Sequence, residues 1–334
     1  MAERPPHTSI ALASPSGTQI VLDISPTGGF MSLSRSDLAG MFPAIPTPLD
    51  ALGEFDRPAL KPVVDHLFDG GMSGVVVLGG TGEYLALTQR ERVEVVEQTV
   101  AAAGGRGPVI AGVLAPGFRE AVEAGKALTQ AGADALMVVT PYYVAPTQAS
   151  LRDYYKAYHE EVGTPVLLYE IPYKTMITVH PETVAGMVED RSIIGMKACN
   201  PDIGHFMHVV SLVGDKMAVL SGEDHLLPVQ LAIGAFGSIH ATANLFPRQW
   251  KRIYDLARAG DLARALKYLD VMRPMMQAVF SEGNPGPLKA AMSMIGLPVG
   301  EALRPLKAPD AELSGRLRAI IAGLQERERN LTAA

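Results

Sequence analysis

The stretch Val75-Val76-Val77-Leu78-Gly79-Gly80-Thr81-Gly82 joins a purely apolar run to a glycine-rich turn. An apolar run without alternating polar residues is typical of a strand that is buried on both faces. Downstream, Thr88-Gln89-Arg90-Glu91 has the pattern of a capping box and predicts a helix to about Ala103, ending at Gly104-Gly105. The stretch therefore predicts one unit of buried strand, loop and helix.

This unit recurs along the chain from Met41 at a spacing of about 25–30 residues. The apolar runs that mark the predicted strands are Phe42–Ile45, Val75–Leu78, Val109–Ala111, Leu136–Val139, Val166–Leu168, Ile193–Met196, Met217–Leu220 and Ser238–Ile239. Eight such units are typical of a closed (β/α)₈ TIM barrel. An open doubly wound sheet is the alternative, because it is built from the same units. The composition does not change near the middle of the chain, and this favours a single closed barrel.

The domain organisation follows from where the repeated unit begins and ends. Residues 1–35 are rich in Pro, Ser, Thr and Gly and predict a disordered N-terminal extension. Residues 36–260 form the predicted barrel. After Trp250 the pattern becomes purely helical, and residues 261–334 predict a C-terminal helical region.

Composition and charge exclude several classes of protein. The chain has 334 residues, 48% of them hydrophobic, a net charge of -6 and a pI of about 5.8. Because no basic stripe is present, we expect no nucleic-acid partner, and because no apolar run is long enough to cross a bilayer, we expect no membrane partner. The single cysteine, Cys199, cannot form an internal disulfide, which agrees with a cytoplasmic location.

Polar side chains follow most of the predicted strands. In barrel enzymes the chemistry lies where strands end and the following loops begin. The residues at these ends are Gly80, Thr81, Tyr142, Tyr143, Tyr169, Glu170, Lys197, Glu223, Asp224 and His240. We therefore expect a polar site at one end of an otherwise apolar barrel.

Lys197 is the strongest candidate for chemistry in this set, because it directly follows the apolar run Ile193–Met196. Burial disfavours the ammonium form, so the sequence predicts a lowered pKa and a free amine near neutral pH. A free amine can attack a ketone and form an iminium, which is an electron sink for C–C cleavage or formation. The alternative is a lysine that extends to solvent or pairs with a carboxylate.

The turn Gly79–Gly82 and the tyrosines would complement such a lysine. Exposed N–H groups of a glycine-rich turn can bind an anion such as a carboxylate, and the Thr81 hydroxyl adds a donor. The turn lacks the nucleotide-binding patterns G-x-G-x-x-G and G-K-[ST], so a nucleotide phosphate site is not favoured. The alternative to an anion site is a tight turn that binds no ligand. The phenols of Tyr142, Tyr143 and Tyr169 can relay protons, although each can also be a packing residue.

A metal-dependent lyase is a further alternative. His205 and His208 lie three residues apart on a predicted helix, and Glu223, Asp224 and His225 lie in a later segment. The histidines fall beyond a strand end and lack the ligand spacing of a known metal site, so a helix surface is the favoured interpretation. No metal, nucleotide or other cofactor is expected.

The ordered motifs together resemble the dihydrodipicolinate synthase / N-acetylneuraminate lyase family, from about Met41 to Pro298. The motifs that carry the resemblance are Gly79-Gly80-Thr81-Gly82-Glu83, Thr140-Pro141-Tyr142-Tyr143, Leu168-Tyr169-Glu170-Ile171-Pro172, Gly195-Met196-Lys197, Ser221-Gly222-Glu223-Asp224 and Asn284-Pro285-Gly286-Pro287-Leu288-Lys289. The resemblance implies a TIM barrel, class I aldolase chemistry on pyruvate or another 2-oxo acid, and a homo-oligomer, either a tetramer or a dimer.

By position, the resemblance implies a role for several residues. Lys197 would form the Schiff base, and Tyr169 would relay protons to it. Tyr143 would be exchanged across a tight dimer interface. Thr81, with the N–H groups of Gly80 and Thr81, would hold the 2-oxo acid carboxylate.

Departures from the family motifs concern the second substrate. Gly80 stands where synthases usually have a threonine that links the two relay tyrosines. Lys174 replaces an arginine that clamps the aldehyde's carboxylate in bidentate fashion, and it offers only a point charge. Cys199 stands where relatives touch the distal part of the substrate. The alternative is that it is simply a small buried residue. These departures keep a dehydratase or aldolase of a 2-oxo-3-deoxy sugar acid as an alternative to a synthase. A metal-dependent lyase and a non-catalytic protein that binds a 2-oxo acid are two further alternatives.

Overall fold

The computed structural model describes Ala11–Leu12, Ile20–Val21 and residues 33–332. The chain divides into two units, Met1–Met31 and Ser32–Ala334. In the first unit, strands β1 (Ala11–Leu12) and β2 (Ile20–Val21) pair antiparallel. Most of the predicted disordered extension, residues 1–35, lies outside the described residues.

In the second unit, the described residues form one eight-stranded sheet with parallel neighbours in the order β3-β10-β9-β8-β7-β6-β5-β4. The strands are β3 (Gly40–Pro43), β4 (Val75–Val77), β5 (Val109–Val113), β6 (Ala135–Val139), β7 (Val166–Glu170), β8 (Gly195–Ala198), β9 (Ala218–Ser221) and β10 (Gly237–His240). A parallel bridge between Ala44 and Val76 joins β3 to β4 and closes the barrel. The predicted TIM barrel is confirmed, and each predicted apolar run overlaps one strand.

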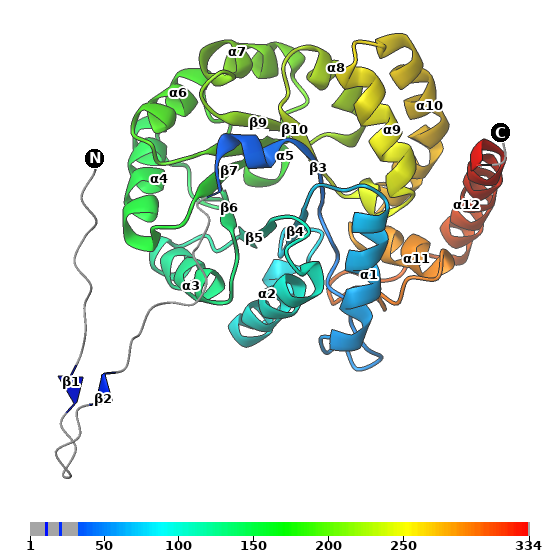
Figure 1. Cartoon of the computed structure of the whole chain (residues 1–334), viewed down its shortest axis with the longest axis horizontal. Coiled ribbons are helices and arrows are strands. Elements are labelled where there is room, and N and C mark those ends of the chain that lie inside the picture. The colour runs from blue at the N-terminus through cyan, green and yellow to red at the C-terminus, as the bar shows by residue number, and fades with distance from the viewer. Residues whose placement is uncertain (1–10, 13–19, 22–32, 333–334) are drawn as a thin grey trace. The chain divides into compact units, whose positions relative to one another are not determined.

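Helices surround the barrel in the order of the chain (Figure 1). They are α1 (Arg57–Asp69), α2 (Gln89–Ala103), α3 (Phe118–Gln130), α4 (Gln148–Val162), the short α5 (Pro172–Thr175), α6 (Pro181–Glu189), α7 (Ile203–Val213), α8 (Leu227–Ala232) and α9 (Pro247–Arg258). The predicted capping box begins α2: the Thr88 N–H donates to the Glu91 carboxylate at 2.7 Å, and Thr88 Oγ1 accepts from the Glu91 N–H. Gly104 ends the helix with a φ of +56°, which favours glycine.

The C-terminal region consists of α10 (Leu262–Val279), α11 (Gly286–Met294) and α12 (Ala311–Thr332). It lies beside α9 and α1 on one side of the barrel (Figure 1). Leu313, Leu317, Ile321 and Leu324 of α12 are buried, so one face of this helix packs on the rest of the region. No helix among the described residues is long and apolar enough to span a bilayer.

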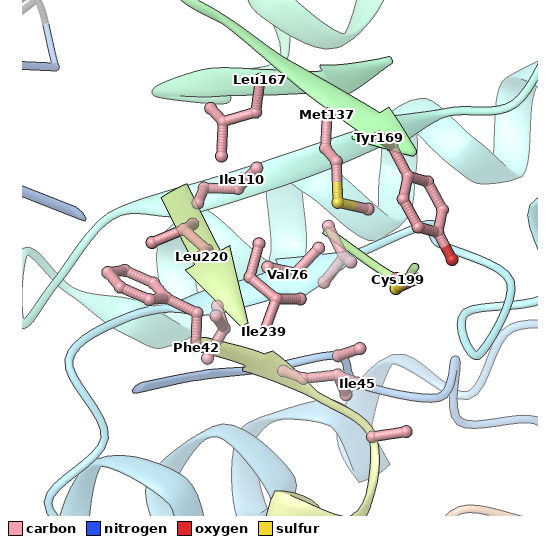
Figure 2. Packing of buried hydrophobic residues seen from close by; sticks show 14 of the residues in the cluster. Phe42, Ile45, Val76, Ile110, Met137, Leu167, Tyr169, Cys199, Leu220 and Ile239 are labelled. Carbon is pink, nitrogen blue, oxygen red and sulfur yellow. The ribbon is translucent and has the colours of Figure 1, made fainter. Parts of the chain in front are cut away.

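Apolar side chains from most of the strands fill the barrel interior (Figure 2). Figure 2 places Tyr169 and Cys199 toward the end to which the arrow of β7 points, beyond apolar residues such as Ile110 and Leu220. Since side chains alternate between the two faces of a strand, Tyr169 faces the interior and its neighbour Glu170 faces the helices. This alternation decides which strand-end residues can share a site.

Candidate active site

Lys197 lies on β8 at the centre of the candidate site. It is the register partner of Tyr169 on β7, and its Nζ is 4.6 Å from the centroid of the Tyr169 ring. Only 8% of Lys197 and 6% of Tyr169 are exposed. The two adjacent strands therefore bring an amine and a phenol together at the carboxyl end of an apolar barrel.

The charge state of Lys197 differs from the sequence-based prediction. Burial favours the neutral amine, but the surrounding acidic groups of Tyr169, Cys199, Asp224 and Glu223 favour the ammonium, and the pKa of Lys197 is raised. The expected lowering of this pKa is therefore wrong. Because an ammonium has no lone pair, Lys197 must lose a proton before it can act as a nucleophile.

Burial sets the protonation state of the Tyr169 phenol. Burial raises the pKa of Tyr169 to about 12, although Lys197 favours the phenolate. The phenol is consequently neutral at pH 7 and carries the proton that a relay requires. This agrees with the expected role of Tyr169 without testing it.

The turn after β4 offers free donors at the same end of the barrel. In the described part of the chain, neither the N–H of Gly80 nor that of Thr81 donates to a backbone or side-chain acceptor. The turn itself is held by the Glu83 N–H, which donates to the Gly80 carbonyl at 3.2 Å, and by Thr47 Oγ1, which donates to the Gly82 carbonyl at 2.8 Å. Such a fixed turn with free N–H groups can bind an anion.

Gly80 is not required by packing. A Cβ at this position would meet no heavy atom within 4 Å, and its φ lies outside the region that favours glycine. The threonine that the family usually carries here would therefore fit. Neither packing nor backbone conformation therefore requires a glycine at position 80.

Cys199 and Glu223 lie beside Lys197 on the distal side of the site. Cys199 is 2% exposed, its Sγ is 3.4 Å from the Gly222 carbonyl oxygen, and burial raises its pKa to about 12. Burial, together with Asp224, raises the pKa of Glu223 to about 7, while Tyr173 and the charge of Lys197 oppose this. The site therefore contains a carboxyl group that titrates near neutrality.

Asp224 and His240 form hydrogen bonds with other residues of the barrel wall and not with Lys197. Asp224 Oδ1 accepts a hydrogen bond from the Thr242 N–H at 3.0 Å and another from the Thr242 hydroxyl. His240 lies behind the barrel wall, with Nε2 3.1 Å from Ser221 Oγ and its ring centroid 5.8 Å from that of Trp250. Burial lowers the pKa of His240 to about 4, so it is neutral. The structure corrects the predicted substrate contact of His240, because strand alternation turns it toward α9.

Lys174 and Tyr143 are both exposed. Lys174 lies on the surface of α5, where no described residue forms an ion pair or hydrogen bond with its side chain. Tyr143 is 100% exposed and has a φ of +73°, a left-handed conformation that is uncommon outside glycine. Within one chain the structure does not bring either residue to Lys197.

The histidines considered as metal ligands each face a different carboxylate. His205 Nε2 is 3.4 Å from Glu170 Oε1, His208 Nε2 is 3.6 Å from Glu182 Oε1, and His225 Nδ1 is 3.8 Å from Glu223 Oε2. Among the described residues, no three His, Cys, Asp or Glu side chains are grouped to hold a metal ion. His205 is half-buried rather than on a helix surface, because α7 packs it against Glu170.

The contact of His205 with Glu170 makes stability depend on pH. Glu170 is 0% exposed and also accepts the Val179 N–H at 3.1 Å. This carboxylate raises the pKa of His205, against burial and with help from Asp202 and Glu182. Because the pKa of His205 is higher in the folded than in the unfolded protein, its protonation stabilises the fold. This stabilisation is fully present below the unfolded-state pKa of about 6.5 and is lost as the pH rises through the folded-state pKa.

We expect His205→Gln to lower the free energy of unfolding by about 1–3 kcal/mol at pH 6 and by less at pH 9. Glutamine lacks the positive charge that the imidazole carries beside the buried Glu170 carboxylate, and the imidazole carries this charge only below its raised pKa. Urea denaturation at both pH values measures the difference. The exposed His208, replaced by glutamine, is the matched control. A His205→Gln deficit that is equal at both pH values would contradict the assignment.

Three residues of the site neighbourhood were not assigned a role from sequence. Tyr173 lies close enough to Glu223 to affect its pKa, Asn284 Nδ2 donates to Thr81 Oγ1 at 2.8 Å, and Lys289 Nζ is 2.5 Å from Glu83 Oε2. Asn284 and Lys289 lie in the C-terminal motif Asn284–Lys289. That motif was visible in the sequence, but its contact with the turn after β4 was not.

Comparison with known proteins agrees with this geometry. Residues 37–323 match the model of the dihydrodipicolinate synthetase family. A 4-hydroxy-tetrahydrodipicolinate synthase of Methylobacterium radiotolerans is 38% identical over 274 residues, which is 82% of this chain and 91% of that protein.

Two solved structures are also similar to the chain. The chloride-inhibited dihydrodipicolinate synthase of Acinetobacter baumannii, solved with pyruvate, aligns with a TM-score of 0.82 at 32% identity, covering 85% of this chain and 98% of that one. A prophage protein of the dihydrodipicolinic acid synthase family from E. coli K12, also solved with pyruvate, aligns with a TM-score of 0.81 at 28% identity, covering 86% and 98%.

Proposed function

The chain belongs to the dihydrodipicolinate synthetase family, and on that premise we propose that it is a Schiff-base lyase or synthase acting on pyruvate or a related 2-oxo acid. The observation that carries the proposal is Lys197, buried on β8 with its Nζ 4.6 Å from the centroid of the Tyr169 ring. Pyruvate-bound relatives of the same fold support this choice of substrate.

The reaction begins when Lys197 loses its extra proton and its neutral amine attacks the C2 carbonyl carbon. A C–N bond forms, the carbonyl oxygen leaves as water after taking up two protons, and an iminium remains. Loss of a proton from C3 gives an enamine, whose C3 attacks an aldehyde in the synthetic direction. Retro-aldol cleavage is the reverse. The neutral phenol of Tyr169 carries these protons, and the N–H groups of Gly80 and Thr81 with the Thr81 hydroxyl hold the carboxylate.

Tyr143 indicates that the working form is an oligomer. Its side chain is fully exposed, and the neighbouring Val144 is 59% exposed. A second copy of the chain would cover this surface and bring Tyr143 to the relay of its partner. We infer a homo-oligomer built on this contact, either a dimer or a tetramer.

Glu223 and Lys174 favour a second candidate for the other substrate. A buried carboxyl group beside Lys197 repels a substrate carboxylate whenever it is ionised, and exposed Lys174 gives no fixed clamp for one. The hydroxyl groups of a 2-oxo-3-deoxy sugar acid would instead find partners in Glu223, Tyr173 and Cys199. The alternative reaction is therefore dehydration or cleavage of such a sugar acid.

A substrate panel tests the proposal. It contains pyruvate with aspartate semialdehyde, N-acetylneuraminate, 2-oxo-3-deoxy sugar acids and hydroxy-2-oxoglutarate. Pyruvate consumption or release is measured, together with formation of 2-oxo products from the sugar acids.

We expect turnover of at least one member, unchanged after exhaustive chelation, because the electron sink is an iminium on the protein. Turnover lost on chelation would support a metal-dependent lyase. Pyruvate that stabilises the fold without any turnover would support a non-catalytic binding protein.

A further inference from the structure

The turn Gly79–Glu83 is fastened to the C-terminal region by three polar contacts. Asn284 Nδ2 donates to Thr81 Oγ1 at 2.8 Å, across 203 positions of sequence. Lys289 Nζ lies 2.5 Å from Glu83 Oε2, and the Leu303 N–H donates to Glu83 Oε1 at 2.6 Å. These contacts join the proposed carboxylate-binding turn to α11 and to the segment that precedes α12.

The contact of Asn284 decides where the Thr81 hydroxyl can donate. A hydroxyl has one donor and two acceptor positions. Since Asn284 donates to Thr81 Oγ1, the oxygen acts there as an acceptor and its proton remains available for another partner. Donation to a hydroxyl oxygen also polarises its O–H bond and strengthens it as a donor. Asn284 therefore presents Thr81 as a donor to an anion.

The ion pair of Glu83 with Lys289 holds the far end of the same turn. The side chains are 2% and 1% exposed, so water does not compete for the contact. The Glu83 backbone has a φ of +59°, a left-handed conformation that needs support in a residue other than glycine. The Lys289 ammonium also donates to the Glu301 carbonyl at 2.9 Å, which completes its pairing.

We propose that Asn284 and Lys289 are positioning residues for the carboxylate of the 2-oxo acid. Asn284 orients the Thr81 hydroxyl, and Lys289 acts through Glu83 to hold the turn whose free N–H groups face the same carboxylate. The C-terminal region is thus part of the substrate site. This inference rests on the proposed function, because it requires that Thr81 binds the 2-oxo acid.

Asn284→Ala and Asn284→Asp separate positioning from packing. The alanine variant removes the donor, and we expect the KM for pyruvate to rise about 3- to 10-fold, as for loss of one neutral hydrogen bond. The aspartate variant keeps the size of the side chain but accepts the Thr81 proton, and we expect a rise of about 10- to 100-fold. In both variants kcat at saturating pyruvate should stay within about threefold of wild type.

The expected order is a larger rise in KM for Asn284→Asp than for Asn284→Ala, and a role in packing alone would not produce this order. A merely structural Asn284 would make the smaller alanine worse than the isosteric aspartate. That order, or an unchanged KM in both variants, would overturn the role of Asn284.

Glu83→Gln/Lys289→Met tests the ion pair. Lys289→Met alone leaves a buried carboxylate unpaired and endangers folding, whereas the double variant removes both charges and keeps the Leu303 N–H partnered. We expect the double variant to fold and to raise the KM for pyruvate about 5-fold or more, as for loss of a charged contact. Lys267→Met on exposed α10 is the matched control and should leave KM unchanged.

Borohydride trapping of pyruvate on each protein distinguishes failure of the proposed function from failure of this inference alone. A wild-type protein that traps no pyruvate would overturn the proposed function and this inference with it. A wild-type protein that traps pyruvate, with a folded double variant of normal KM, would overturn only the role of Lys289.

Discussion

Lys197→Met is expected to abolish the irreversible addition of pyruvate under borohydride and to lower turnover by about 10⁴-fold or more, the scale seen when a covalent nucleophile is removed. The wild-type protein should gain the mass of reduced pyruvate at Lys197 alone. Methionine is close to lysine in length and fills the apolar barrel without the amine, so the fold should persist. Mass spectrometry of the trapped protein and a steady-state assay measure the two effects.

The matched control for this experiment is Lys216→Met. Lys216 is exposed in the loop before β9 and has no place in the proposed site. This variant should trap pyruvate as the wild type does. A Lys197→Met protein that still traps pyruvate and turns over would exclude the Schiff-base mechanism.

Tyr169→Phe should lower kcat by about 10²- to 10⁴-fold, the contribution usual for a positioned proton donor. The phenylalanine ring keeps its contact with Lys197, whose Nζ lies 4.6 Å from the Tyr169 ring centroid, so only the hydroxyl is lost. Pyruvate should still be trapped at Lys197, but more slowly, because the amine remains and the proton relay does not. Single-turnover trapping rates and steady-state kcat separate these outcomes.

Tyr268→Phe on α10 is the matched control for the loss of a phenol, since the Tyr268 ring lies under the Arg252 guanidinium outside the site. It should retain the wild-type rate. A Tyr169→Phe variant with wild-type kcat would remove Tyr169 from the relay. Because the pKa of Tyr169 is about 12, its own titration should not shape the rate profile between pH 6 and 9.

Much of the fold was predictable because its signals are local. The strands of the barrel are buried on both faces, so each appears as an apolar run that needs no partner to be recognised. The beginning of α2 was predicted at Thr88 because a capping box is made within four neighbouring residues. Lys197 and Tyr169 were predicted as catalytic residues from equally local signals. Each directly follows an apolar run, and each stands in one of the family motifs.

The orientation of strand-end residues was only partly predictable. Tyr169 and Glu170 are neighbours, yet one faces the barrel interior and the other faces α7. His240 was placed among the substrate contacts, but it faces Trp250. A shift of one residue in where a strand ends reverses the face of a side chain, and local patterns do not locate strand ends that closely.

Short-range patterning was enough to predict the strands of the barrel, their order along the chain and a lysine at the end of a buried strand, because each of these signals lies within a few neighbouring residues. The tertiary structure was needed to establish the charge state of Lys197, since this depends on acidic groups at three different strand ends. It alone also placed Asn284 on Thr81 and Lys289 on Glu83. Contacts between segments some two hundred residues apart depend on how the whole chain closes, and no local pattern contains that information.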